Sequence, residues 1–196
     1  GIGPEIQQND VASQLLQFQS DACYREIAFQ DAAIPLLGVG EIPHFEVRRR
    51  YGNPFLPFFF VQSERWRTLA VLLGGANETS RVVDVGCGCG RMAWALRGLL
   101  RKGAYVGFDL DLEAITFATG AYADAKNFAF IWHPVQSAMY GGPSGFPPAC
   151  EKPWPVEDGG ADLVIAQSVW THLKQTDAAW YLKEAARGET VLELPE

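Results

Sequence analysis

The feature that most constrains this chain is Val82–Arg91, which reads VVDVGCGCGR. An apolar run breaks there into three alternating glycines, and a helical pattern follows. Glycine lacks a Cβ, so its backbone can turn sharply and approach a ligand closely. A helix beginning near Arg91 would point its unpaired N–H groups and the positive end of its dipole at the same place. The run therefore predicts a strand, a loop that cradles an anionic group, and a helix.

Two cofactors fit the glycine spacing. The register Gly88-x-Gly90-x-x-Ala93 satisfies the dinucleotide fingerprint, which predicts a nicotinamide-dependent oxidoreductase. Read from Asp84 as D-x-G-x-G-x-G, with Gly86 as its first glycine, the run resembles motif I of the class I S-adenosylmethionine-dependent methyltransferases. That resemblance implies S-adenosyl-L-methionine as the cofactor.

A second motif lies about twenty residues past the glycines, the distance expected for a ribose-binding carboxylate. The apolar run 104–108 ends at Asp109. An ionised carboxylate offers only acceptors, so it can take both hydroxyls of a ribose. This feature serves either cofactor. The alternative is that Asp109 caps the following helix, although Asp111 is better placed as its N-cap.

A third motif distinguishes the two cofactors. An apolar stretch at 161–166 is followed by QSVWTHL over 167–173 and by a helical pattern over 177–187. This segment is similar to that of many bacterial small-molecule methyltransferases, and a dehydrogenase has no use for it. The resemblance covers roughly residues 81–187 and implies a methyltransferase that acts on a small-molecule acceptor, which the sequence does not identify.

The resemblance also implies a set of cofactor-binding residues: Asp84, Gly86, Cys87, Gly88, Gly90, Arg91, Asp109, Leu110, Val135, Gln136 and Gln167. The ammonium of the methionyl end lies near Asp84, its carboxylate near Arg91, and the adenine against Leu110. The chain departs from the family at Pro134, where relatives often carry an acidic residue that accepts from the adenine amino group. Val135, Gln136 and Ser137 are the remaining candidates for that contact, and we expect weaker affinity.

Residues for catalysis and for the acceptor are harder to assign. His172 is the best candidate for a general base, because it is a titratable imidazole just beyond the fourth strand; the alternative is a structural histidine within its turn. Trp170 either shields the methyl group or fills the core. Phe59, from the aromatic cluster at 55–60, either lines the acceptor pocket or belongs to the core.

The fold class predicted from the element order is α/β. Strands near 81–85, 104–108, 128–132 and 161–166 alternate with helices, which predicts a Rossmann-like, doubly wound and mostly parallel sheet. Ligands of such sheets bind beyond the carboxyl ends of the strands. Residues 1–74 are predicted to form a helical and loop cover, loop-rich over 34–57 with a helix over 62–73, and residues 75–196 the cofactor-binding core.

The predicted core is incomplete at its C-terminal end. Residues 188–194 could supply a fifth strand, so the sheet lacks the last two strands of its class. An open edge of this kind favours a homodimer. Together with Pro134, it also motivates a second hypothesis, a non-catalytic relic that keeps the fold.

Composition argues against several classes of partner. The formal net charge is −7 and Arg48–Arg50 is an isolated basic run, which disfavours a nucleic acid. Of the four cysteines, Cys87 and Cys89 lie inside the glycine loop, and no ligand pair with zinc-site spacing accompanies them, so we expect no metal. Free thiols predict a reducing compartment. No run approaches the roughly 18 apolar residues of a membrane span, and no signal pattern opens the chain. We therefore expect a cytoplasmic protein without a membrane partner.

Overall fold

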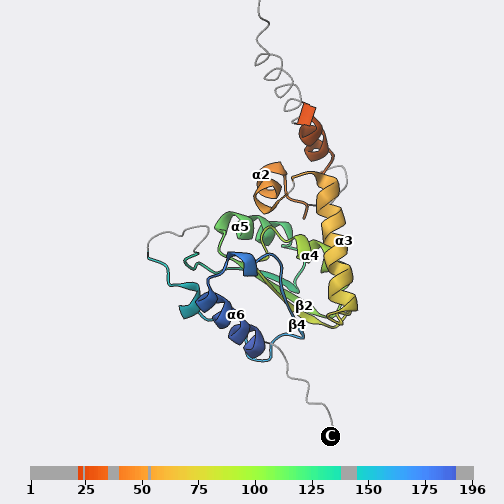
Figure 1. The fold of residues 1–196 in the computed structure, drawn as a ribbon. Coiled ribbons are helices and arrows are strands. Elements are labelled where there is room, and N and C mark those ends of the chain that lie inside the picture. The colour runs from red at the N-terminus through yellow and green to blue at the C-terminus, as the bar shows by residue number, and fades with distance from the viewer. Residues whose placement is uncertain (1–21, 24, 35–39, 53, 138–144, 189–196) are drawn as a thin grey trace, which may run out of the picture.

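The computed structural model describes residues 22–23, 25–34, 40–52, 54–137 and 145–188 (Figure 1). A parallel sheet forms the centre of the described structure, with strand order β3-β2-β1-β4. Its strands are β1 (Arg81–Val85), β2 (Ala104–Asp109), β3 (Phe128–Trp132) and β4 (Leu163–Ala166). The predicted α/β fold class and the four predicted strands are confirmed, with β4 beginning two residues later than the apolar run.

The position of β1 determines where a ligand can bind. Asp84 in β1 pairs with Gly107 of β2 on one side and with Ile165 of β4 on the other. The chain therefore runs outward from β1 through β2 to β3 and then returns to the opposite side of β1. The reversal creates a crevice beyond the carboxyl ends of β1 and β4, which is where ligands of open α/β sheets bind.

Helices cover both faces of the sheet (Figure 1). One face carries α3 (Leu56–Leu72), α4 (Arg91–Arg97) and the end of α5 (Leu112–Ala121), and the other carries α6 (Gln175–Gly188). Short helical turns connect them: α2 (Phe45–Arg48), η2 (Arg49–Tyr51), η3 (Ala149–Glu151) and η4 (Trp170–His172). None of the helices within the described ranges is long and apolar enough to cross a membrane.

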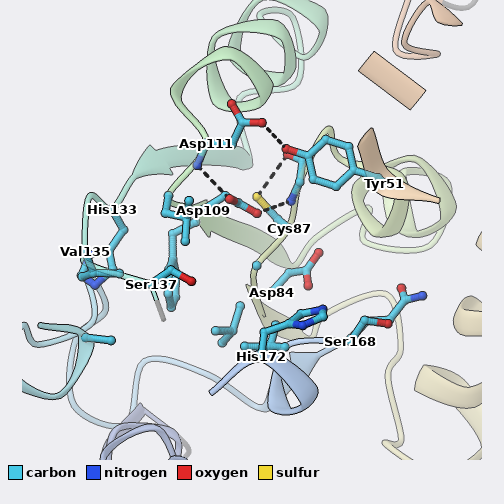
Figure 2. Close-up of a pocket in the computed structure, with 18 of the residues that line it drawn as sticks. Tyr51, Asp84, Cys87, Asp109, Asp111, His133, Val135, Ser137, Ser168 and His172 are labelled. Atoms are coloured by element: carbon cyan, nitrogen blue, oxygen red, sulfur yellow. Dashed lines mark hydrogen bonds between the residues drawn. The ribbon is translucent and has the colours of Figure 1, made fainter. Parts of the chain in front are cut away.

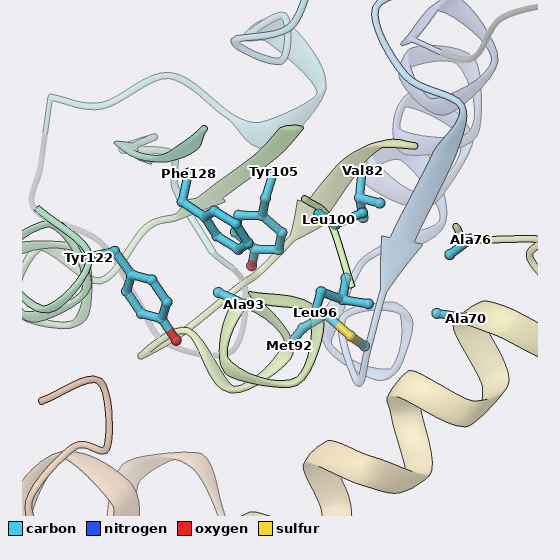
Figure 3. Packing of buried hydrophobic residues seen from close by; sticks show 10 residues of the cluster. All are labelled: Ala70, Ala76, Val82, Met92, Ala93, Leu96, Leu100, Tyr105, Tyr122 and Phe128. Atoms are coloured by element: carbon cyan, nitrogen blue, oxygen red, sulfur yellow. The ribbon is translucent and has the colours of Figure 1, made fainter. Parts of the chain in front are cut away.

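Alternation along the strands builds two cores. Val82 faces α3 and α4, where it packs with Leu96 and with the stacked rings of Tyr105 and Phe128 (Figure 3). Val83 and Val85 face the opposite side. They pack there in a cluster that also contains Phe108, Trp154 and the α6 residue Tyr181. Because successive side chains of a strand point to opposite faces, one apolar run supplies both cores.

Three boundaries differ from the sequence-based predictions. Helix α3 begins at Leu56, with Phe55 as its N-cap, so the aromatic cluster lies inside the helix and not before it. The described part of the loop-rich segment contains the helical turns α2 and η2, flanked by Pro43 and Pro54. Gly188 is the last residue of α6 and does not begin a strand. The remaining residues of the predicted fifth strand, 189–194, lie outside the described residues, as do 1–21 of the cover.

Gly103, just before β2, tests the packing of this end of the sheet. A Cβ at this position would lie 2.1 Å from the backbone oxygen of Ser80, which cannot move aside without breaking its hydrogen bond from Ala104 N–H. We expect Gly103→Ala to lower the free energy of unfolding by about 1–3 kcal/mol, measured by urea denaturation. Gly98→Ala is the matched control. Gly98 has helical backbone angles and open space around it, so that variant should be neutral or slightly stabilising. Equal effects of the two variants would contradict this assignment.

Candidate functional site

A cavity of about 720 Å³ lies at the carboxyl ends of the strands, as the strand order requires. Each strand contributes to it through a residue at or next to its end: Asp84 for β1, Asp109 for β2, His133 for β3 and Gln167 for β4. Figure 2 shows Asp84, Asp109 and His133 around a common space, with Tyr51 on one side and His172 on another.

The glycine loop forms one wall of the cavity. Gly86, Gly88 and Gly90 have φ angles of 70°, 53° and 84°, a region that other residues rarely adopt. The loop is also closely packed. A Cβ at Gly86 would lie 2.7 Å from the Val169 side chain, and a Cβ at Gly88 would lie 2.7 Å from the Tyr51 ring. Glycine is therefore required at these two positions both by the backbone and by the space available.

Asp84 is a buried carboxyl group at the centre of the site. It is 3% exposed, and the hydroxyl of Tyr105 donates to its Oδ2 at 2.6 Å. Burial disfavours the ionised form and raises the pKa of Asp84 to about 7, although the Tyr105 hydrogen bond acts in the opposite direction. Asp84 can therefore change its charge near neutral pH when a ligand alters its surroundings.

Asp109 joins the glycine loop to the end of β2. Its Oδ2 accepts from the backbone N–H of Gly88 at 2.8 Å, and its Oδ1 accepts from that of Asp111 at 2.9 Å (Figure 2). Burial raises the pKa of Asp109, and these backbone hydrogen bonds oppose the rise. Each oxygen keeps lone-pair capacity for a hydroxyl from the cavity. The capping alternative for Asp109 is wrong, because the N-cap of α5 is Asp111, which accepts from the N–H groups of Glu113 and Ala114.

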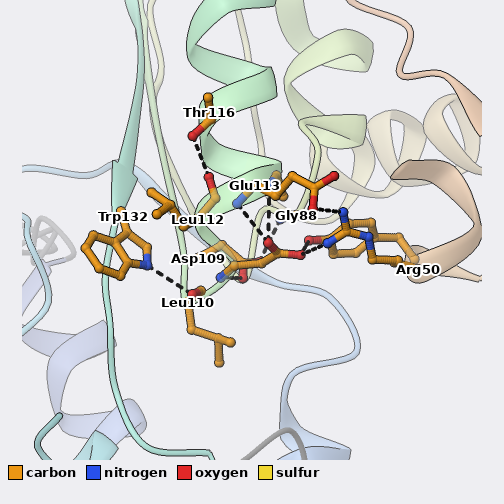
Figure 4. A network of polar contacts seen from close by, with 11 residues as sticks. Arg50, Gly88, Asp109, Leu110, Leu112, Glu113, Thr116 and Trp132 are labelled. Atoms are coloured by element: carbon orange, nitrogen blue, oxygen red, sulfur yellow. Dashed lines mark hydrogen bonds and ion pairs between the residues drawn. The ribbon is translucent and has the colours of Figure 1, made fainter. Parts of the chain in front are cut away.

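Leu110 and Val135 line the cavity between β2 and β3, together with Gln136 and Ser137. The Gln136 side-chain amide donates to the carbonyl oxygen of Phe146 at 2.7 Å, which ties down the connection toward β4. The side-chain N–H of Trp132 donates to the Leu110 carbonyl at 3.0 Å and fixes the backbone there (Figure 4). This side of the cavity therefore combines the apolar side chains of Leu110 and Val135 with the polar groups of Gln136 and Ser137.

Two histidines line the cavity. His133 is 4% exposed, and burial lowers its pKa to about 4, so its imidazole is neutral at physiological pH. His172 belongs to η4 and is half-buried. Between β4 and η4, Ser168 has a φ of 59°, the single positive φ among the described non-glycine residues. Strained backbone of this kind tends to occur at functional sites.

The structure brings most of the predicted site residues together. Those that line the cavity are Asp84, Gly86, Cys87, Gly88, Arg91, Asp109, Leu110, Val135, Gln136, Gln167 and His172. Gly90 instead serves as the N-cap of α4. Trp170 is 40% exposed and Phe59 is 4% exposed, and neither lines this cavity. Phe59 packs with Phe60 and Trp94, so the structure places it in a core cluster, which was the other interpretation of the aromatic run.

Other lining residues were missed by the sequence analysis, notably Arg50, Tyr51, His133, Asp177 and Tyr181. Arg50 and Tyr51 come from the cover, and Asp177 and Tyr181 from α6. Proximity in space is what assigns all five to the cavity, and no motif in the sequence marks them.

The two loop cysteines are buried thiols. Burial raises the pKa of Cys87 well above its usual value and that of Cys89 to about 12, so both stay protonated. A Cβ at Gly107 would lie 2.8 Å from the Cβ of Cys87, which shows how tightly this side chain is packed. Within the residues that the structure describes, no three His, Cys, Asp or Glu side chains gather as metal ligands would.

Comparisons with known proteins agree with this geometry. The model of the methyltransferase domain family matches residues 83–188, more than half of the chain. A structure of a candidate S-adenosyl-L-methionine-dependent methyltransferase from Methanococcus maripaludis shares 17% identity, with a TM-score of 0.50 over 67% of this chain and 53% of that one. A SAM-dependent methyltransferase from Aquifex aeolicus shares 18% identity, with a TM-score of 0.47 over 63% and 58%. The YcgJ protein of Bacillus subtilis shares 19% identity, with a TM-score of 0.48 over 64% and 46%.

The chain spans about half the length of these solved structures. At this level of identity the first structure supports the fold alone, and the family match carries the assignment. The matched residues include the glycine loop from Val83 onward, Asp109, the end of β4 and the whole of α6. The chain therefore belongs to the methyltransferase domain family and has the Rossmann-like fold of the class I S-adenosylmethionine-dependent enzymes.

Proposed function

We propose that this chain binds S-adenosyl-L-methionine in the cavity at the strand ends and transfers a methyl group to a small-molecule acceptor. The observation that carries the proposal is the joined pair of motifs: Asp109 accepts from Gly88 N–H, and both residues line one cavity. A carboxylate held against a glycine loop offers acceptors for a ribose beside space for a methionyl chain. The family match supports the same assignment.

The residues present fit the cofactor. Asp109 would accept from the ribose hydroxyls, Leu110 and Val135 would contact the adenine, and Asp84 would pair with the methionyl ammonium. Gly86 and Gly88 line the cavity with positive φ angles, so the backbone of the loop can turn closely around the methionyl chain. When bound, S-adenosyl-L-methionine supplies a methyl group already activated by its sulfonium.

Few of the chain's own residues need to take part in the chemical step. Much of the rate enhancement of such a transfer can come from alignment and from exclusion of water, which a partly apolar cavity provides. For an acceptor that must lose a proton, we assign the base to His172, which lines the cavity beyond β4. His133 is neutral and can donate or accept a hydrogen bond without bringing a charge into the cavity.

Pro134 removes the carboxylate that relatives direct at the adenine amino group. The Gln136 side-chain nitrogen donates to the carbonyl oxygen of Phe146, so the acceptors for that contact are the Gln136 Oε1, the backbone carbonyl of Val135 and the hydroxyl of Ser137. We therefore propose modest cofactor affinity. The nicotinamide alternative is the weaker one, because the family match spans both the glycine loop and the segment after β4.

Isothermal titration calorimetry with S-adenosylhomocysteine, S-adenosylmethionine and NAD⁺ tests the cofactor. We expect saturable binding of the first two and none of NAD⁺. A transfer assay with labelled methyl donor against a panel of small amines, thiols and phenols then tests activity. Binding without transfer to any acceptor would favour the relic hypothesis. Absence of binding, or tighter binding of NAD⁺ than of S-adenosylhomocysteine, would overturn the proposal.

A further inference from the structure

We propose that Arg50 and Tyr51 form a latch that retains the cofactor and holds Asp109 in its binding position. This inference rests on the proposed function and adds to it a positioning role for two residues of the cover. The Arg50–Tyr51 latch lies outside the segment that matches the family model, residues 83–188. Both of its residues line the cavity, with Arg50 exposed and Tyr51 half-buried, so the latch lies where the cavity meets solvent.

The latch binds the first turn of α5. The Tyr51 hydroxyl donates to Asp111 Oδ2 at 2.8 Å, and Arg50 Nη1 lies 3.1 Å from the same oxygen. A second nitrogen of Arg50 pairs with Glu113 (Figure 4). Burial and the nearby carboxylates raise the pKa of Tyr51 above its usual value, so its hydroxyl remains a donor at physiological pH. Asp111 therefore uses Oδ2 for the latch and Oδ1 to cap α5.

Hydrogen bonds connect the residues that the latch contacts to Asp109, the proposed ribose-binding residue. The backbone N–H of Asp111 donates to Asp109 Oδ1, and Gly88 N–H donates to Asp109 Oδ2. The Tyr51 ring also packs against Gly88 so closely that a Cβ there would not fit. The latch thus contacts both elements that orient the Asp109 carboxylate: the turn at Asp111 and the glycine loop. Removing the latch contacts should therefore make the orientation of the Asp109 carboxylate less fixed.

The latch has a rigid support. Arg48, two residues before it, is 2% exposed and donates to the carbonyl oxygens of Pro43 at 2.5 Å and Pro54 at 2.6 Å. It also pairs with Asp31 at 2.7 Å. These bonds tie together the segments on both sides of η2. Because the segment that carries Arg50 and Tyr51 is anchored in this way, we expect their bonds to Asp111 and Glu113 to slow the release of a ligand from the cavity.

The charged half of the latch should respond to salt. The side chains of Arg50, Asp111 and Glu113 are 35%, 25% and 64% exposed, so their attraction is partly screened by dissolved ions. The Tyr51 hydrogen bond involves a neutral donor and is less sensitive. We expect the dissociation rate of S-adenosylhomocysteine from the unmodified protein to rise about threefold between low and high salt.

Stopped-flow release of S-adenosylhomocysteine tests the latch, using Tyr51→Phe and Arg50→Ala in the full chain. We expect each variant to release the ligand about 3- to 10-fold faster, with a melting temperature lowered by no more than about 4 °C. Arg50→Ala should also lose the salt dependence, and Arg50→Lys should restore part of it. Arg49→Ala is the matched control. Within the described residues Arg49 forms its ion pair inside the cover, with Glu46, so this variant should leave release unchanged.

Asp111→Ser separates the latch from the helix cap. Serine is a good N-cap but lacks the second oxygen that Tyr51 and Arg50 use. We expect fast release from this variant and no further increase when Tyr51→Phe is added, since both remove the same bond. Release as slow as that of Arg49→Ala in all latch variants, or additive effects of Tyr51→Phe and Asp111→Ser, would overturn the latch. A protein that binds no S-adenosylhomocysteine at all would instead overturn the proposed function.

Discussion

Asp109→Ala is expected to weaken binding of S-adenosylhomocysteine by at least about 100-fold. Two effects combine. The variant removes the carboxylate proposed to hold both ribose hydroxyls, and charge-assisted hydrogen bonds contribute about 1.5–3 kcal/mol each. It also leaves the N–H groups of Gly88 and Asp111 without their acceptor, so the glycine loop and the turn before α5 lose the bonds that position them. Calorimetric titration at constant pH measures the change.

Asp109→Asn sharpens this prediction. An asparagine keeps one carbonyl oxygen but must direct an NH₂ group at either Gly88 N–H or Asp111 N–H, so we expect it to bind nearly as weakly as alanine. Asp124→Ala is the matched control: that carboxylate is 75% exposed and pairs with Arg97 outside the cavity. Affinity within about threefold of the unmodified protein for Asp109→Asn would show that the carboxylate does not hold the ribose.

The sheet could be predicted because helices cover both of its faces, so its strands are mostly apolar. Each reads as a short apolar run, such as Phe128–Trp132, and such runs are marked by the turn residues and helical patterns around them. The carboxyl ends of parallel strands meet at one edge, so Asp84, Asp109 and Gln167 could be placed in one cavity without coordinates. The hydrogen bonds of Asp84 and Asp109 could not be predicted, because their donors, the Tyr105 hydroxyl and the Gly88 N–H, each lie 21 residues away in the sequence.

The cover was predicted less well, and for physical reasons. Proline and glycine at 34–57 mark chain turns but do not exclude single helical turns such as α2 and η2 between them. Pro57 lies in the first turn of α3, where a proline is tolerated, so it did not mark an end to the helix. Tyr51 contacts Asp111 across a separation of 60 residues, and no local pattern encodes such a contact.

The pH dependence of Asp84 follows from its burial. The pKa of this carboxyl is about 7 in the folded protein and near 3.8 when the chain is unfolded. As the pH rises, Asp84 therefore loses its proton at a lower pH in the unfolded chain than in the folded protein. The contribution of Asp84 to stability is complete below pH 4 and is lost as the pH rises through about 7, which amounts to at most about 4 kcal/mol. Folding thus favours the protonated form of Asp84, whereas cofactor binding should favour the ionised form, because the methionyl ammonium would pair with it.

Asp84→Asn should therefore separate stability from binding. Asparagine can still accept from Tyr105 but cannot ionise, so we expect the variant to unfold at higher urea concentration than the unmodified protein at pH 8, with the difference shrinking toward pH 5. Its affinity for S-adenosylhomocysteine should fall by at least about tenfold at pH 8.

The unmodified protein should bind S-adenosylhomocysteine about tenfold more tightly for each pH unit up to 7. It should also release a proton on binding, detectable by calorimetry in buffers of different ionisation enthalpy. Asp162→Asn should have the opposite effect on stability. Arg81 lowers the pKa of Asp162, so the contribution of this carboxylate to stability is present at neutral pH and lost in acid. We therefore expect this variant to be less stable than the unmodified protein at neutral pH. A pH-independent affinity together with an unchanged stability of Asp84→Asn would show that Asp84 neither titrates near 7 nor meets the ligand's charge.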